Sequence, residues 1–249
     1  MTGEVPWPAW LGVAFAIVIF VGAQVIASLI LWIIPDAAGW TRAKTTDWLQ
    51  NSLAAQLSYI FLASGLSLGG IYALVRPYGR TGFHSIGLKK PQWIDPLYGL
   101  LALPVYLLTY VGILSLVLLF APHLNLDQKQ ELGFDGNYSG LQLVPVFISL
   151  VVLPPLTEEI VFRGVLYSSF KKLLSLWPAV LLTSLLFAAG HLAEGGSGGP
   201  LYIAAIDTFT LSLILIYLRE KTGRLWASMT LHALKNLIAF VTLFLLHAR

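Results

Sequence analysis

The stretch PPLTEEIVFR (Pro154–Arg163) decides how the chain is interpreted, because it places two carboxylates and an arginine inside an apolar run. A charged side chain at bilayer depth is costly, so such residues are functional candidates by default. Pro155 is suited to open a helix and Thr157 to cap it, which would put both glutamates in the positive first turn. Glu159 and Arg163 are spaced i and i+4 with the acid first, the favourable order for an ion pair.

Glu158 is the other carboxylate of this stretch. On a helix it lies about 140° around the axis from Arg163, by the 3.6-residue repeat. We therefore expect Arg163 to hold Glu159 ionised and Glu158 to remain available for chemistry. The alternative is a buried ion-pair cluster that only pins two helices together, since structural ion pairs often resemble functional sites.

The composition is that of an integral membrane protein. Hydrophobic residues make up 57% of the 249 positions and charged residues 11%, about half the charged fraction of a soluble domain. The net charge is +3, and basic residues spread over several short loops suit an anionic membrane surface and not a nucleic acid. Cysteine is absent, which excludes disulfides, thiolate metal sites and a cysteine nucleophile.

The apolar segments predict an all-α fold, a polytopic transmembrane bundle of about seven to eight helices with an internal polar site in the cell membrane. The first apolar run is too long for a signal peptide, so we expect it to remain as a span. Residues 122–140 form a polar excursion, the best candidate for a gate over a site. The expected spans are 10–34, 49–75, 97–121, 141–174, 178–193, 201–219 and 225–247.

Residues 141–174 would measure about 51 Å as one helix, too long for a straight span. We expect Pro154 and Pro155 to break this segment into helices at 141–153 and 156–174. We count this segment as one crossing and place the N-terminus inside. Nine lysines and arginines then fall in the inner loops and four in the outer segments. The positive-inside rule then predicts an N-inside, C-outside orientation.

Further polar residues lie in the later helices: His191, Asp207, His232 and Asn236. His232 and Asn236 are i and i+4, so they share one helix face. A carboxylate beside an imidazole can take a proton from water and return it to a leaving group. A second imidazole and a carboxamide are donors suited to an oxyanion. No Gly-x-Ser-x-Gly elbow is present, so water is the expected nucleophile.

A metal site is an open alternative, because Glu158, His191 and His232 could supply three zinc ligands and leave a position for water. The sequence contains no His-Glu-x-x-His motif, and the same groups also work without a metal. A metal-free glutamate mechanism is the preferred hypothesis, with zinc as the alternative cofactor.

Three motifs, Glu158-Glu159-x-x-x-Arg163, Phe187-x-x-x-His191 and His232-x-x-x-Asn236, resemble in order and spacing those of the CPBP intramembrane metalloprotease family. This is the group of the type 2 CAAX prenyl proteases, the bacteriocin-processing proteins and the abortive-infection proteins. The resemblance implies that Glu158 activates water with help from His191 and that His232 and Asn236 form the oxyanion side. Glu159 and Arg163 are the supporting pair.

The resemblance covers residues 141–249, the expected catalytic helical core, whereas residues 1–140 carry helices without a recognisable motif. It implies an intramembrane protease that cleaves a membrane-associated peptide or a lipidated protein of the CAAX type, surrounded by membrane lipid. The alternatives are a non-catalytic scaffold or bacteriocin-immunity protein that keeps the fold, and a transporter or proton relay. Lys235 stands where an apolar or aromatic residue is expected, so it must snorkel or pair, with Asp207 or Glu159 as partners.

Overall fold

The computed structural model describes residues 4–128, 134, 138, 140–192 and 199–246. Within these residues the regular secondary structure is helical, with no strand, so the predicted all-α class is confirmed. Nine of the 19 positions of the expected gate at 122–140, and five of the seven positions of the connection at 194–200, lie outside the described residues. The N-terminal part contains α1 (Ala9–Ala37), α2 (Arg42–Asn51), α3 (Leu53–Val75), α4 (Gly79–Ser85) and α5 (Ile94–Phe120).

The C-terminal part begins with a long helix that changes its winding along its length. Its α-helical segments α6, α7 and α8 alternate with π-helical segments, in which the backbone hydrogen bond spans five residues instead of four. Three further helices follow. The bounds are α6 (Leu143–Phe147), π-helix Ile148–Val152, α7 (Leu153–Glu158), π-helix Glu159–Leu166, α8 (Tyr167–Leu173), α9 (Leu176–His191), α10 (Tyr202–Thr222) and α11 (Trp226–Phe240), which continues as a π-helix over Val241–Leu246.

The predicted break at Pro154 and Pro155 is wrong. Helical winding continues from Gly140 to Leu173, and the two prolines lie at the start of α7 inside it. Thr157 does not cap a helix, because it lies inside the continuous helix and its buried hydroxyl makes no hydrogen bond with the described residues. A proline in a helix removes one backbone donor, yet here the winding passes from the π-helix Ile148–Val152 into α7 without ending.

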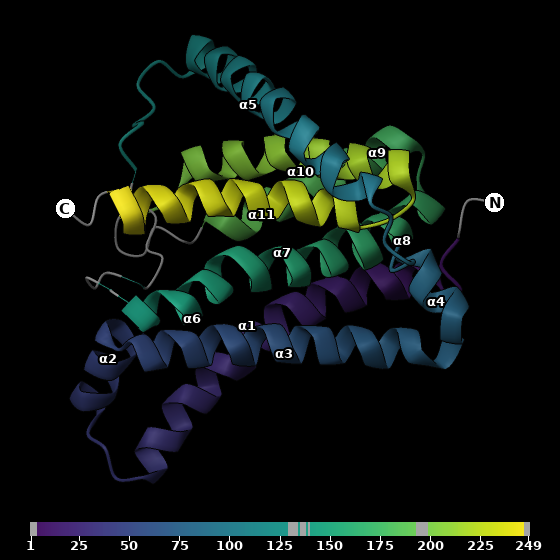
Figure 1. Ribbon diagram of the computed structural model, residues 1–249. Coiled ribbons are helices and arrows are strands. Elements are labelled where there is room, and N and C mark those ends of the chain that lie inside the picture. Colours follow the sequence, from purple (N-terminus) through teal and green to yellow (C-terminus); the bar gives the residue numbers. More distant parts are fainter. Residues whose placement is uncertain (1–3, 129–133, 135–137, 139, 193–198, 247–249) are drawn as a thin grey trace.

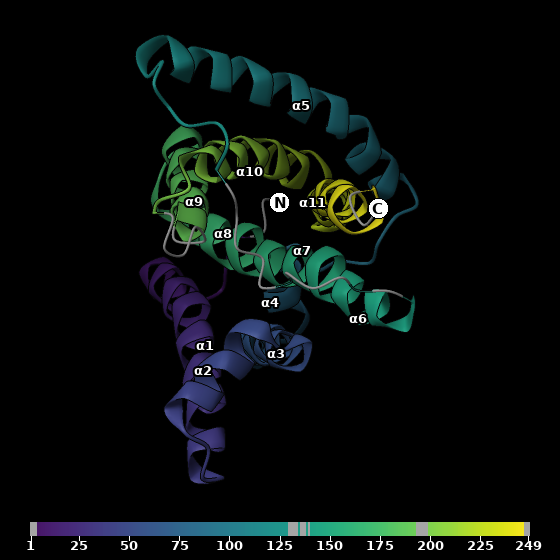
Figure 2. The ribbon, with the colours of Figure 1, turned by 90° about the vertical axis from the view of Figure 1, so that its left-hand side faces the viewer.

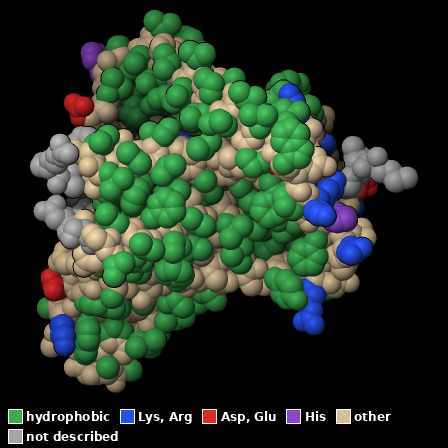
Figure 3. All heavy atoms as spheres, viewed as in Figure 1, with side chains coloured by type: hydrophobic (Ala, Val, Ile, Leu, Met, Phe, Trp, Pro, Cys, Tyr) green, Lys and Arg blue, Asp and Glu red, His purple; other side chains and the backbone are tan. Residues whose placement is uncertain are grey.

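Six helical segments of the described chain are long and apolar enough to cross a membrane. The α9 helix is apolar but shorter, with 16 residues. Side chains on the outside are apolar over most of the visible face (Figure 3), and Phe120 and Leu108 are 85% and 75% exposed. Such exposure suits a hydrocarbon environment and not water. The chain is therefore a multi-pass membrane protein.

The helices form layers around the long α6–α8 helix (Figures 1 and 2). The α1 and α3 helices pack together and cover one side of the α6–α8 helix, while α9, α10 and α11 cover the other. The α5 helix lies across α10 and α11 as an outer layer. The α6–α8 helix, which carries both glutamates, is therefore enclosed by helices from both parts of the chain.

The termini lie at opposite ends of the bundle (Figure 1), and lysine and arginine side chains gather mainly at the end near the N-terminus (Figure 3). The continuous Gly140–Leu173 helix counts as a single crossing, as the charge count assumed. The N-inside orientation itself stays a prediction, since no membrane accompanies the structure.

Two contacts fix the start of α5 against α11. A Cβ atom at Gly99 would lie 2.6 Å from the Cβ atom of Thr230, so only glycine permits this approach of the two helices. Next to it, Arg224 donates from Nε and Nη2 to the buried Asp95 carboxylate at 2.7–3.0 Å. This hydrogen-bonded pairing raises the pKa of the Arg224 guanidinium, so the guanidinium remains charged at any physiological pH.

Candidate active site

The predicted site residues come from three helical regions of the C-terminal part. Glu158 ends α7 and Glu159 begins the π-helix Glu159–Leu166. His191 ends α9, and His232 lies in the middle of α11. The first and third regions come together through direct polar contacts, and the second joins them through an aromatic ring.

The centre of the site is a fully buried ion pair. Glu159 Oε1 accepts a hydrogen bond from Arg163 Nη1 at 2.9 Å, and both side chains have no exposed surface. This confirms the i, i+4 pairing expected from the sequence. His232 Nδ1 lies 3.0 Å from the same Glu159 oxygen. Because an ionised carboxylate only accepts hydrogen bonds, this imidazole nitrogen is the donor.

Glu158 has different surroundings from its neighbour. Its side chain is 18% exposed, against none for Glu159. Its Oε2 atom lies 3.8 Å from His232 Nε2, which is longer than a direct hydrogen bond. His232 therefore lies between the two carboxylates, with Nδ1 directed to Glu159 and Nε2 directed to Glu158.

The Phe187 ring connects the second histidine to this centre. His191 and His232 make edge contacts with it, with ring centroids 4.8 and 6.0 Å away. The Arg163 guanidinium lies over the same ring, 4.2 Å from its centroid. Such cation–π contact stabilises a charge that is shielded from water. In the sequence motif Phe187 is marked only by its spacing from His191, and an aromatic residue one turn before a histidine is a weak signal for these contacts.

His191 is oriented by its own helix. Its Nδ1 atom lies 2.9 Å from the carbonyl oxygen of Phe187, one turn earlier. A carbonyl can only accept, so Nδ1 carries the proton and Nε2 of the neutral ring keeps a lone pair. The ring can therefore accept a proton at Nε2, which is the property that a general base requires.

Asn236 faces the α6–α8 helix. Its Nδ2 atom donates a hydrogen bond to the carbonyl oxygen of Leu150 at 2.9 Å. One of the two amide hydrogens is thus committed to the backbone, and the other is available for a further contact.

Lys235 pairs with Asp207, one of the two partners that the sequence suggested. The Nζ–Oδ2 distance is 3.1 Å, and the Tyr106 hydroxyl donates to the other oxygen of this carboxylate. This second cluster joins α5, α10 and α11. Asp207 and Lys235 therefore belong to a cluster beside the site.

The donor set was also tested against a metal ion. Both histidines present Nε2 as a lone-pair donor, the form that binds zinc, and Glu159 holds His232 as a carboxylate outside the metal shell would. However, in the described part of the chain no three His, Asp or Glu side chains are grouped so that they could hold a metal ion. The arrangement does not fit a three-ligand zinc site, and we derive no step through a metal.

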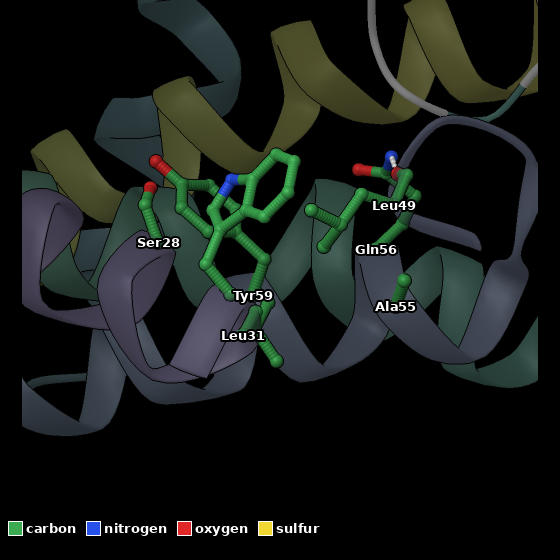
Figure 4. A pocket seen from close by; sticks show the side chains of 7 residues that line it. Ser28, Leu31, Leu49, Ala55, Gln56 and Tyr59 are labelled. Atoms are coloured by element: carbon green, nitrogen blue, oxygen red, sulfur yellow. Dashed lines mark hydrogen bonds between the residues drawn. The ribbon is translucent and has the colours of Figure 1, made fainter. Parts of the chain in front are cut away.

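A separate hollow of about 220 Å³ lies between α1, α2 and α3. Figure 4 shows Tyr59 and Gln56 at this hollow, with Gln56 donating to the backbone carbonyl of Leu49. Its other lining residues are Ser28, Leu31, Trp32 and Ala55. None of the predicted site residues lines it, so it is not part of the candidate active site.

A family model matches the C-terminal part of the chain. Residues 140–238 match the family model described as type II CAAX prenyl endopeptidase Rce1-like. The chain carries an Rce1-like domain. This match confirms the suspected relationship to the CAAX prenyl protease group, a membrane protease family. The matched range includes every predicted site residue.

One curated relative also matches, an Escherichia coli protein named "Uncharacterized 24.3 kDa protein". It is 29% identical over 92 residues, which are 36% of this chain and 40% of that protein. The matched segment thus spans less than half of the relative, and its name states no activity. No solved structure matches the chain.

Proposed function

We propose that the chain is an intramembrane endopeptidase that hydrolyses a peptide bond in a membrane-associated peptide or a lipidated protein, with prenylated CAAX-type proteins as the first substrate class to test. The match of residues 140–238 to the type II CAAX prenyl endopeptidases supports the reaction class. The observation that carries the proposal is the placement of His232 Nε2 3.8 Å from Glu158 Oε2, beside a buried ion pair.

Water is the nucleophile in this proposal. A water molecule about 2.8 Å from each of two polar atoms can bridge a gap of this width. Glu158 takes one proton from the water as its oxygen attacks the carbonyl carbon of the substrate. The proton then passes to the leaving amine as the C–N bond breaks, and the Nε2 lone pair of His191 assists this transfer.

The oxyanion of the tetrahedral intermediate requires hydrogen-bond donors directed at the former carbonyl oxygen of the substrate. The second amide hydrogen of Asn236 is one candidate. His232 is the other. Because its Nδ1 hydrogen is directed to Glu159, it donates from Nε2 only as an imidazolium, a form that requires a second proton taken up from solvent before the reaction. The adjacent Glu159 carboxylate offsets the charge of that form. The Glu159–Arg163 pair thereby supports the reaction without touching the substrate.

The test uses the full chain reconstituted in liposomes, with a quenched prenylated peptide and an unprenylated peptide library as substrates. Glu158→Ala and His191→Ala are each expected to lower cleavage by about 10²- to 10⁴-fold, the usual contribution of an acid or base. Glu4→Ala is the control, because it removes an exposed glutamate far from the site in sequence. Unchanged cleavage by both site variants would overturn the mechanism. No cleavage of any substrate by the unmodified protein would favour a non-catalytic scaffold.

A further inference from the structure

The bond between Asn236 and Leu150 joins two helices that are 86 residues apart in the chain. Asn236 lies on α11 and Leu150 in the π-helix Ile148–Val152. Around the bond the contacts are apolar, since Leu150 and Leu237 pack against a cluster that includes the buried Val151 and Phe240. A backbone carbonyl left without a donor in such surroundings would be strongly unfavourable.

The Leu150 carbonyl has no donor available in its own helix. In α-helical winding the donor would be the N–H four residues later, and in π-helical winding the N–H five residues later. Those positions are Pro154 and Pro155, and proline has no N–H. The N–H three residues later, that of Leu153, bonds instead to the Ile148 carbonyl.

We infer that the Asn236 side chain replaces the backbone donor that Pro154 and Pro155 cannot supply, and so clamps α11 to the α6–α8 helix. The clamp lies one helical turn from His232 on α11 and about two turns from Glu158 on the other helix. It therefore fixes the 3.8 Å spacing of His232 Nε2 from Glu158 Oε2. Asn236 is a positioning residue in this respect. The consequence for cleavage rests on the proposed function, whereas the clamp itself does not.

The clamp predicts a specific rescue, because alanine at either proline position restores a backbone N–H. Asn236→Ala is expected to lower the midpoint of thermal unfolding by about 3–10 °C, the effect of a buried acceptor left without a donor in a chain of this size. Pro154→Ala restores the α-helical donor and Pro155→Ala the π-helical one. In a double-mutant cycle, at least one of them should recover half or more of the loss.

Pro104→Ala is the matched control, because Pro104 also lies inside a membrane helix, α5, and has no part in the clamp. It should recover nothing. Strict additivity of Asn236→Ala with both Pro154→Ala and Pro155→Ala would overturn the inference. If Asn236→Ala does not yield folded protein, the double variants are tested for recovery of folded protein. Recovery with Pro154→Ala or Pro155→Ala, but not with Pro104→Ala, supports the inference. Absence of recovery with both clamp prolines replaced in turn contradicts the inference.

Cleavage separates positioning from the oxyanion role. The double variants still lack the Asn236 amide, so a residue that acted only as an oxyanion donor would give no recovery of kcat. Positioning instead predicts that the better of the two double variants has a kcat several-fold above that of Asn236→Ala, with KM changed less. No recovery of kcat despite recovered stability would restrict Asn236 to a structural clamp and contradict the positioning role. This stability readout does not depend on activity, so it stands even if the proposed reaction is wrong.

Discussion

Two polar clusters share helix α11 and differ in how far they are shielded. In the closed cluster, the Glu159 and Arg163 side chains have no exposed surface and His232 has 5%. In the open cluster, Lys235 is 27% exposed and Asp207 is 18% exposed. A charge in the closed cluster depends entirely on its protein partners. In the open cluster the side chains are partly exposed, so the long Lys235 side chain can reorient when its partner is lost.

The clusters also differ in what they join. The closed cluster lies wholly within residues 140–238, the Rce1-like domain, and its histidine faces Glu158. The open cluster includes Tyr106 of α5, which precedes that domain. We conclude that the closed cluster supports the candidate active site and that the open cluster attaches α5 to the domain. Depth inside the bundle, and not the mere presence of membrane charges, distinguishes the two.

The largest effect is expected from Arg163→Ala. Removal of the guanidinium leaves Glu159 buried without its counter-charge, and breaking a buried pair costs about 3–5 kcal/mol. The unfolding midpoint in detergent should fall by about 10 °C or more. The double variant Arg163→Met with Glu159→Leu removes both charges and should regain much of this loss. An unfolding midpoint for Arg163→Ala close to that of the unmodified protein would show that the Glu159 carboxylate does not depend on the Arg163 charge.

A smaller effect is expected from Asp207→Asn. Lys235 is partly exposed and its long side chain can reorient, so the loss of unfolding free energy should be about 1 kcal/mol, near that of one hydrogen bond. Cleavage should stay within a few-fold of the unmodified protein. Tyr106→Phe, which removes only the α5 hydroxyl, should have a similar effect on the unfolding midpoint. A hundredfold loss of cleavage in Asp207→Asn would instead make Asp207 part of the active site.

The smallest effect is expected from Lys171→Ala. Lys171 pairs with Glu220 at the surface, where the two side chains are 34% and 33% exposed. Such pairs contribute about 0.2–1 kcal/mol and are screened by salt. The midpoint difference from the unmodified protein should vanish in high salt, and Glu220→Ala should behave alike. A fall in the unfolding midpoint as large as that of Arg163→Ala would contradict the expectation that buried ion pairs contribute more to stability than exposed ones.

The sequence was sufficient to predict the apolar membrane spans and the buried ion pair of Glu159 with Arg163. Apolar runs define the spans because every backbone group in lipid must bond within its own helix. The i, i+4 spacing of Glu159 and Arg163 is a local property of one helix, so their pairing could also be predicted. The α2 helix was missed, although Thr41, whose side chain accepts a bond from the Lys44 N–H, is an ordinary helix-capping residue.

The continuity of the helix across Pro154 and Pro155 could not be predicted from the local sequence. Local rules favour a break there because the prolines remove donors. The replacement donor comes from Asn236, which reaches Leu150 only in the folded bundle. The same applies to His232, whose place between Glu158 and Glu159 depends on the packing of α11 against the α6–α8 helix. The roles of Glu158, His191, His232 and Asn236 in a reaction stay predictions.

The most direct measurement compares Glu158→Gln with Glu159→Gln in the same liposomes, recording cleavage and unfolding together. Glu158→Gln should lower cleavage at least about a hundredfold and lower the unfolding midpoint only slightly, because the Glu158 side chain is 18% exposed whereas that of Glu159 is fully buried. Glu159→Gln should lower the midpoint far more, because it leaves Arg163 buried without its counter-charge. Cleavage by Glu158→Gln within a few-fold of the unmodified protein would contradict the account, whatever the midpoints.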